Sequence, residues 1–106
     1  MYKPLPDTLT IKQSGVHGLG LFAKEGLAQG TNLGMSHLKI GDTIFRTPLG
    51  GFINHANEAN CVKVDLRMTN EDLQGHQYSY KKWNLITSQD VKKGDELTVR
   101  YTFYNV

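Results

Sequence analysis

The centre of this 106-residue chain holds the stretch Gly51-Phe-Ile-Asn-His-Ala-Asn-Glu-Ala-Asn-Cys61. Asn54 and His55 follow an apolar pair, and further hydrogen-bonding side chains come after them. Such a run can hold a polar small molecule through backbone and side chains together, although an Asx-rich loop that satisfies its own backbone has the same composition. His55 and Cys61 are residue types that ligate metals, but no matched Cys or His pair stands at zinc spacing, so we expect no metal site.

Alternating apolar residues follow this stretch. They occupy every second position over 62–68, which predicts a half-buried strand. A polar connection is expected over 69–75. A second strand is expected over 78–87, where the alternation changes phase near Lys81-Lys82, as a β-bulge would cause. A last strand is expected over 97–101.

Short segments bounded by glycine precede the central stretch. Strands are expected over Leu9–Gln13, Leu19–Ala23, Leu33–Ile40 and Thr43–Arg46. Pro48-Leu-Gly-Gly51 predicts a tight turn, and at most one short helix or helical turn is expected, near Gly51–Ala56. The fold class is therefore mainly β, and the length fits one domain over residues 1–106.

Composition narrows the functional classes. Hydrophobic residues make up 39% and charged residues 21%, and a net charge of +2, spread along the chain, argues against nucleic-acid binding. The single cysteine, Cys61, allows no internal disulfide and suits a reducing compartment. No secretion signal or membrane span is visible, so we expect an intracellular protein (cytoplasm, host cell or nucleus) with no membrane partner. The small core leaves both a monomer and a homodimer open.

Two further segments carry candidate chemistry. His17-Gly-Leu-Gly-Leu-Phe-Ala23 contains a Gly-x-Gly, which lets a ligand approach the main chain, although a bare Gly-x-Gly is commonly a hairpin turn. It lacks the third glycine of a dinucleotide fingerprint and the lysine of a phosphate loop, so nucleotide-phosphate binding is disfavoured. Lys93-Gly-Asp-Glu-Leu-Thr-Val-Arg-Tyr101 is an acidic turn that leads into a strand, and its tyrosine would by default pack the core.

The order of the three segments (15–23, 51–61 and 93–104) resembles the signature of SET-domain lysine methyltransferases. Asn54-His55 with Asn60-Cys61 is similar to the family's Asn-His-Ser-x-x-x-Asn-Cys, with Ala56 in place of serine. Lys93-Gly-Asp-Glu-Leu-Thr is similar to the family's Lys-Gly-Glu-Glu-Leu-Thr. The resemblance implies a β-clip fold of small sheets with a pseudoknot-like, threaded carboxyl-terminal segment, a rare exception to unthreaded topology.

The resemblance also implies a function. The chain would transfer a methyl group from S-adenosylmethionine, leaving S-adenosylhomocysteine, to a lysine side chain of a protein substrate such as a histone tail or a host protein. Tyr101 would be the catalytic residue. The cofactor-binding residues would be His17, Gly18, Leu19, Gly20, Asn54, His55, Tyr101, Phe103 and Tyr104.

Departures from the family affect the acceptor side. The insert that helps bind the substrate peptide is cut to about Leu27–Gly51, and no tyrosine falls at the usual channel positions. The residues expected to line the channel are His37, Phe52, Val62, Lys63 and Val99. No cysteine-rich zinc module is expected. A partner subunit could complete the substrate cleft. Viral or phage versions of the domain are similarly short.

Two alternatives stay open. The chain could be a SET-fold binding module that is catalytically weak or inactive, which Ala56 and the missing channel aromatics favour. It could also be a structural β-clip protein, which would have no affinity for S-adenosylmethionine. Cofactor binding without methyl transfer would indicate the binding module.

Overall fold

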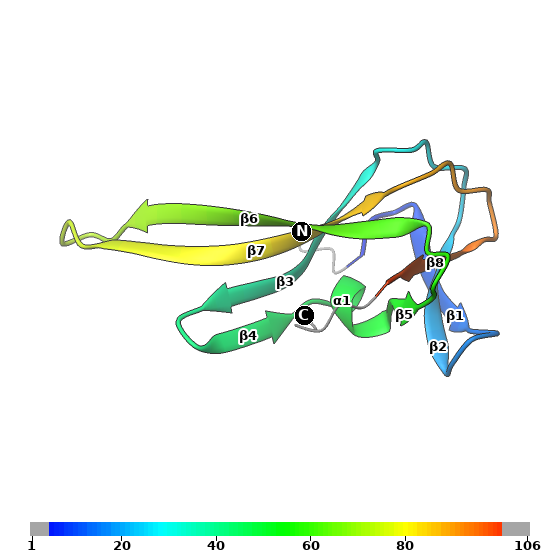
Figure 1. Ribbon diagram of the computed structural model, residues 1–106, viewed down its shortest axis with the longest axis horizontal. Helices are drawn as coiled ribbons and strands as arrows, with labels where there is room; N and C mark the ends of the chain where they lie inside the picture. Colours follow the sequence, from blue (N-terminus) through cyan, green and yellow to red (C-terminus); the bar gives the residue numbers. More distant parts are fainter. Residues whose placement is uncertain (1–4, 101–106) are drawn as a thin grey trace.

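The computed structural model describes residues 5–100. Eight strands and one short helix lie in this range (Figure 1). In chain order they are β1 (Leu9–Gln13), β2 (Leu19–Ala23), β3 (Asn32–Ile40), β4 (Thr43–Arg46), α1 (Pro48–Phe52), β5 (Asn54–His55), β6 (Cys61–Glu71), β7 (Gln77–Thr87) and β8 (Glu96–Val99). The prediction of a mainly-β fold is confirmed, and none of the helices in the described range is long and apolar enough to cross a lipid bilayer.

The prediction of a tight turn at residues 48–51 is wrong, because these residues begin α1. Thr47 caps the helix by accepting a hydrogen bond from the backbone N–H of Gly50, and Pro48 stands in the first turn, where its missing N–H costs nothing. Leu49 is buried and anchors the helix to the core. The helical turn expected near residues 51–56 therefore lies nearer the amino end, and α1 ends at Phe52.

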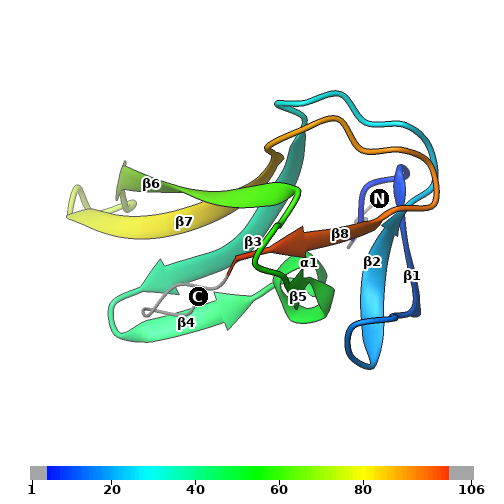
Figure 2. The same ribbon diagram turned by 45° about the vertical axis from the view of Figure 1, so that its right-hand side comes forward.

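The strands form one curled sheet in the order β1-β2-β8-β6-β7-β3-β4, with β5 paired to β8 off this path. β8 joins the two halves of the sheet. It pairs antiparallel with β2, and parallel with β5 and β6, where His55 and Cys61 lie opposite Val99. Figure 2 shows β8 between the β1–β2 hairpin and the longer β6–β7 hairpin. The segment expected to thread the fold beyond β8 lies outside the described residues.

The apolar core lies where β2, β7 and β8 meet α1. Its buried side chains are Leu9, Leu21, Ala23, Leu27, Leu33, Leu49, Ile53, Cys61, Leu85, Val91, Leu97 and Val99. Burying an aliphatic side chain of this size contributes about 1.5–3 kcal/mol relative to leaving it exposed. Leu97 and Val99 on β8 are among the most buried, so core packing fixes the position of the strand that carries Glu96.

The β6–β7 hairpin extends away from the core (Figure 1). The sequence correctly predicts a strand over 62–68, but Val62, Val64 and Leu66 are 45%, 38% and 41% exposed, so the expectation that their face is buried is wrong. The alternation gave the period of the strand. Alternation does not show whether another layer of the protein covers the apolar face of a strand. In the described part of the chain, the side chains of Val62, Val64 and Leu66 stay partly exposed to solvent.

The bulge expected at Lys81-Lys82 is also absent. Pairing of β6 with β7 runs without a shift from Cys61–Thr87 to Glu71–Gln77. The irregularities lie in β3, between Asn32 and Gly34 and between Met35 and His37. Gly34 has a φ of 115°, which an L side chain rarely adopts, so the glycine permits the shift.

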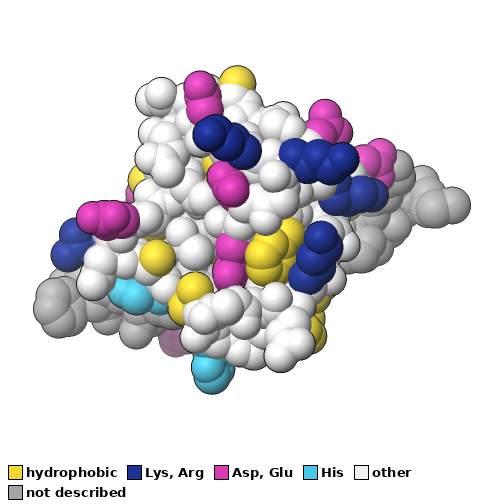
Figure 3. Space-filling view, turned by 90° about the vertical axis from the view of Figure 1, so that its right-hand side faces the viewer, with side chains coloured by type: hydrophobic (Ala, Val, Ile, Leu, Met, Phe, Trp, Pro, Cys, Tyr) yellow, Lys and Arg dark blue, Asp and Glu magenta, His cyan; other side chains and the backbone are white. Residues whose placement is uncertain are grey.

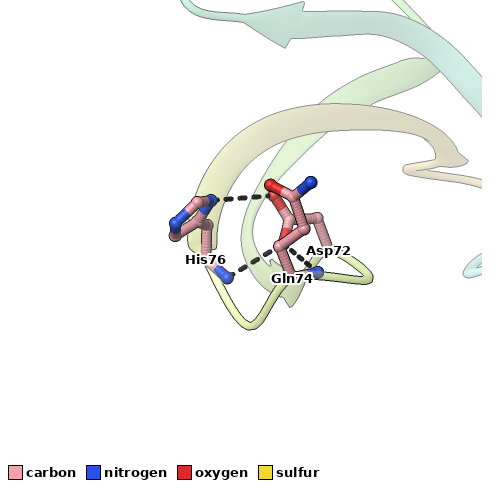
Figure 4. A network of polar contacts seen from close by, with 3 residues as sticks. All are labelled: Asp72, Gln74 and His76. Carbon is pink, nitrogen blue, oxygen red and sulfur yellow. Dashed lines mark hydrogen bonds and ion pairs between the residues drawn. The ribbon is translucent and has the colours of Figure 1, made fainter.

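Asp72 closes the turn at the tip of the β6–β7 hairpin (Figure 4). Its Oδ1 accepts hydrogen bonds from the backbone N–H groups of Gln74 and His76, both at 2.9 Å, and its Oδ2 lies 3.5 Å from Nδ1 of His76. Because the turn satisfies its own backbone, the two strands reach Glu71 and Gln77, further than the polar connection expected over 69–75 suggested.

Candidate functional site

The His17–Gly20 segment leads from the β1–β2 turn into β2, and Ser14 holds the turn in shape. The N–H of Ser14 donates to the carbonyl of Gly18 at 2.7 Å. The Ser14 hydroxyl accepts from the N–H groups of Val16 and His17 at 2.8 and 3.2 Å. Gly18 has a φ of 49°, in the left-handed region that favours glycine. This segment is therefore a hairpin turn with a defined, self-satisfied backbone.

Asn54 connects this turn to β8. Its amide nitrogen lies 3.1 Å from the carbonyl oxygens of His17 and Leu19 and 2.9 Å from Oε2 of Glu96. An amide NH₂ has two hydrogens, so these three acceptors share its donors. Four of the predicted cofactor residues, His17 to Gly20, thus lie against a fifth, Asn54, although more than 30 positions separate them in sequence.

Glu96 is a residue of this site that the sequence interpretation missed. Its carboxylate accepts from the Ser14 hydroxyl at 2.7 and 2.8 Å and from the Asn54 amide. A Cβ at position 20 would overlap this carboxylate, so any larger residue there would require Glu96 to move. Glu96 stands in the Lys93–Tyr101 segment, but the sequence carries no signal for its role, since a carboxylate on a strand next to a turn is common.

Asn60 is the second missed residue, and it attaches the central stretch to β8. Its side-chain amide donates to the carbonyl of Glu96 at 2.9 Å, and its side-chain oxygen accepts from the N–H of Thr98 at 2.9 Å. The side chain is only 9% exposed. The Asn60 side chain therefore makes the hydrogen bonds to the β8 backbone that a neighbouring strand would otherwise make. We call Ser14, His17–Gly20, Asn54, Asn60 and Glu96 the polar junction.

His55 follows Asn54 on β5 and pairs in parallel with Val99. Its Nε2 lies 3.3 Å from Oδ1 of Asn57, and the N–H of Ala56 donates to the carbonyl of Val99 at 3.2 Å. The backbone of the Asn-His pair is therefore held alongside β8, next to the polar junction. The predicted aromatic partners of this site, Phe103 and Tyr104, and the predicted catalytic Tyr101 lie outside the described residues.

A cavity of about 620 Å³ lies at the other end of β8. It is lined by Lys39, Ile44, Cys61, Val62, Lys63, Asp65, Lys81, Trp83, Val99 and Arg100. Three residues expected in the acceptor channel, Val62, Lys63 and Val99, are thus brought together, whereas His37 and Phe52 are not among its lining. β8 carries Glu96 of the polar junction at its start and Val99 of the cavity at its end.

Trp83 is the aromatic residue among the described residues that line the cavity, and from its sequence pattern it was predicted only to lie in a strand. Its ring lies 5.0 Å from Nζ of Lys81, a distance typical of a cation–π contact. No tyrosine was expected at the channel positions, and the structure supplies an aromatic wall from β7 instead. Sequence alone did not indicate that Trp83 lines the cavity, because it stands 20 or more positions from Val62 and Lys63. A further turn separates it from Val99 on β8.

His37 lies behind this wall. It is buried, its Nδ1 lies 2.9 Å from the Ser36 hydroxyl, and its ring meets Trp83 edge-on with centroids 6.4 Å apart. Burial, with help from the positive charges of Lys63 and Arg46, lowers the pKa of His37 to about 4. The ring is therefore neutral at pH 7, and in the described structure its neighbours are those of a packed core residue.

Burial also changes two ionisable groups of the cavity wall. It raises the pKa of the Cys61 thiol to about 12, so the thiolate that a nucleophile or metal ligand needs is not formed at neutral pH. Burial lowers the pKa of Lys63. Among residues 5–100 no group of three or more His, Cys, Asp and Glu side chains is arranged to hold a metal ion.

Comparison with known proteins agrees with this architecture. The family model described as "SET domain" matches residues 34–102. A crystal structure of a candidate histone methyltransferase of Plasmodium falciparum superposes with a TM-score of 0.65, at 14% sequence identity, over 92% of this chain and 96% of that one. At that identity the likeness concerns the fold. No curated protein matches the sequence.

Proposed function

This chain belongs to the SET-domain family, and from that premise we propose that it methylates a lysine side chain of another protein with S-adenosylmethionine as donor. One observation carries the proposal: the Asn54 amide contacts the carbonyl oxygens of His17 and Leu19 and the carboxylate of Glu96. The segments that resemble the family's cofactor motifs thus meet at one place in space.

The chemistry of the polar junction fits that donor. Two main-chain carbonyls and the half-buried Glu96 carboxylate bring three acceptors together there, where they share the donors of the Asn54 amide. The methionine portion of S-adenosylmethionine carries a positive sulfonium and an ammonium group, which such acceptors stabilise. We propose that His17–Gly20, Asn54 and Glu96 hold this portion, that His55 presents its backbone to the adenine, and that Phe103 or Tyr104 covers the adenine ring.

When bound, S-adenosylmethionine supplies a methyl group activated by positive sulfur. The protein's contribution is to bring the acceptor amine to near-attack distance and to keep it uncharged. An unperturbed lysine has a pKa of about 10.4 and cannot attack as an ammonium ion. The apolar side chains of Val62 and Val99 and the cations around them disfavour the ammonium form, which lowers the acceptor's pKa without a dedicated base.

We propose two residues that touch the acceptor amine. Tyr101, the residue after Arg100, would orient the nitrogen through its hydroxyl. Trp83 would face the aliphatic and ammonium parts of the incoming lysine, because its ring already lies 5.0 Å from the Nζ of Lys81. Trp83 would then replace the channel aromatics that the shortened insert lacks.

The competing function is a binding module that holds the cofactor without turnover, which Ala56 in place of the family's serine favours. The test incubates the protein with S-adenosylmethionine and a mixture of cell proteins, and mass spectrometry then finds any methylated lysine. A methyl mark that is lost in Tyr101→Phe, while calorimetry shows unchanged cofactor binding, supports the enzyme. Binding without any mark supports the module, and the absence of binding supports a purely structural protein.

A further inference from the structure

The cavity at the end of β8 concentrates positive charge. Four of its lining residues are cationic, Lys39, Lys63, Lys81 and Arg100, and one is acidic, Asp65. The whole chain, in contrast, has 12 Lys and Arg against 10 Asp and Glu. At the opposite end of the molecule, around β1 and β2, basic and acidic side chains lie close together (Figure 3). The excess of positive charge is therefore local to this cavity, and we call it the cationic cavity.

Strand register explains how the cations gather. Arg67 of β6 lies directly opposite Lys81 of β7, and Lys81 lies directly opposite Lys39 of β3. Directly paired residues share a face of the sheet, so three cations stand in one row across three adjacent strands. Asp65 forms an ion pair with one of them, because its Oδ2 lies 3.3 Å from Nζ of Lys81. Within residues 5–100 no ion pair is found for Lys39 or Arg67.

A negative partner bound at this row would offset the repulsion between its cations. Like charges placed directly opposite each other in neighbouring strands destabilise a sheet. Two further cations outside this row, Lys63 and Arg46, act together with burial to lower the pKa of His37. A ligand that carries carboxylates would remove the repulsion.

The shape of the site favours a protein segment over a nucleic acid. The cations line a cavity of about 620 Å³ together with apolar and aromatic side chains, those of Ile44, Val62 and Trp83. Side chains of a peptide can fill such a cavity while its carboxylates meet the cations at the rim. A nucleic-acid backbone needs an extended basic surface, which a chain of net charge +2 does not offer outside this cavity.

Two members of the row, Lys39 and Lys81, line the cavity together with Lys63 and Arg100. From this concentration of cations we infer that the preferred methyl acceptor is a lysine flanked by aspartate or glutamate, not the lysine of a basic tail. The inference rests on the proposed function, because it takes the cavity as the acceptor side. The two roles of the cations are compatible: they disfavour the ammonium form of the acceptor, and the acidic flanks restore the binding energy that this repulsion removes.

The experiment compares three short peptides of equal length, each with one central lysine, flanked by glutamates, by serines or by arginines. Methyl transfer from S-adenosylmethionine is followed by mass spectrometry. We expect kcat/KM to rise about tenfold from the serine to the glutamate peptide, and to fall further for the arginine peptide. Lys39→Glu should remove most of this preference, whereas Lys24→Glu, an exposed change of equal charge outside the cavity, should keep it.

Binding measured separately distinguishes the two ways in which the idea can fail. Fluorescence anisotropy of the labelled peptides is recorded with S-adenosylhomocysteine present and salt varied. Preferential, salt-sensitive binding of the glutamate peptide without transfer supports the acidic preference and contradicts the enzyme. Transfer at equal kcat/KM to all three peptides supports the enzyme and overturns the preference. Tighter binding of a single-stranded oligonucleotide than of the glutamate peptide, lost in Lys39→Glu, would also overturn it.

Discussion

The polar junction and the cationic cavity lie at opposite ends of one four-residue strand, β8, and they are built in opposite ways. In the junction nearly every polar group has several partners: Glu96 alone accepts from Ser14 and Asn54, and its carbonyl accepts from Asn60. Among the described residues that line the cavity, four are cationic and Asp65 is the one carboxylate, 3.3 Å from Nζ of Lys81. The polar groups of the junction are therefore satisfied within the fold, whereas the charges of the cavity leave room for a partner of opposite charge.

The largest effect should come from the junction. Asn60→Ala removes two hydrogen bonds to β8 and leaves the carbonyl of Glu96 and the N–H of Thr98 without them. We expect the free energy of unfolding to fall by about 2–5 kcal/mol, measured by urea denaturation. Asn57→Ala, at an exposed position of the same loop, should cost less than about 0.5 kcal/mol. Equal losses in both variants would contradict the role of Asn60 as a clamp.

The next largest effect is a pH dependence of the free energy of unfolding that arises from His37, the buried histidine that packs against Trp83. The folded-state pKa of His37 is about 4 and its unfolded value about 6.5, so the unfolded chain binds the extra proton between these values. The stability due to the neutral ring is complete above about pH 6.5 and is lost as the pH falls toward 4, by up to about 3 kcal/mol. His37→Phe should flatten the stability profile in this window. An unchanged slope would show that His37 does not titrate there.

A smaller effect should separate cofactor binding from folding. Glu96→Gln keeps the shape of the side chain but removes the negative charge that we assign to the sulfonium and ammonium groups. We expect S-adenosylmethionine to bind about tenfold more weakly by calorimetry, equivalent to ~1.4 kcal/mol. Glu58→Gln, in the exposed part of the 54–61 loop, is the matched control and should bind normally. If Glu96→Gln binds as tightly as the parent, the carboxylate only supports the fold.

The smallest effect tests the turn itself. Gly18 and Gly15 both have open space where a Cβ would stand, but only Gly18 has a positive φ. Gly18→Ala should therefore destabilise the fold by about 1 kcal/mol through backbone strain alone. Gly15→Ala should be neutral or slightly stabilising, because it restricts the unfolded chain. Thermal melts of the two variants measure the difference, and a reversed order would contradict the assigned conformation.

Sequence patterns predicted the parts of the structure that depend on neighbours along the chain. Alternation located β1, β2 and β4 at their observed bounds, and β3 to within one residue. It failed for α1, because the pattern Pro-Leu-Gly-Gly suggests a turn until Thr47 is recognised as a cap. It also failed for the outer face of β6, since a period of two does not say which face another layer covers.

The candidate site divides in the same way. Asn54 and the His17–Gly20 turn could be identified from ordered segments, and the structure brings them into contact. Glu96 and Asn60 could not, because each gains its meaning only when β8 lies beside the 54–61 loop. The cationic row could not be predicted either, because its members come from β3, β6 and β7 and meet only through strand register.

The most direct test of the central claim is amide chemical-shift mapping of the ¹⁵N-labelled protein with S-adenosylhomocysteine. We expect the largest shifts at Ser14–Gly20, Asn54–His55 and Glu96, with the signals of Lys39 and Lys81 in the cationic cavity little changed. Shifts confined to the cavity, or no shifts at saturating ligand, would contradict the assignment of the cofactor to the polar junction.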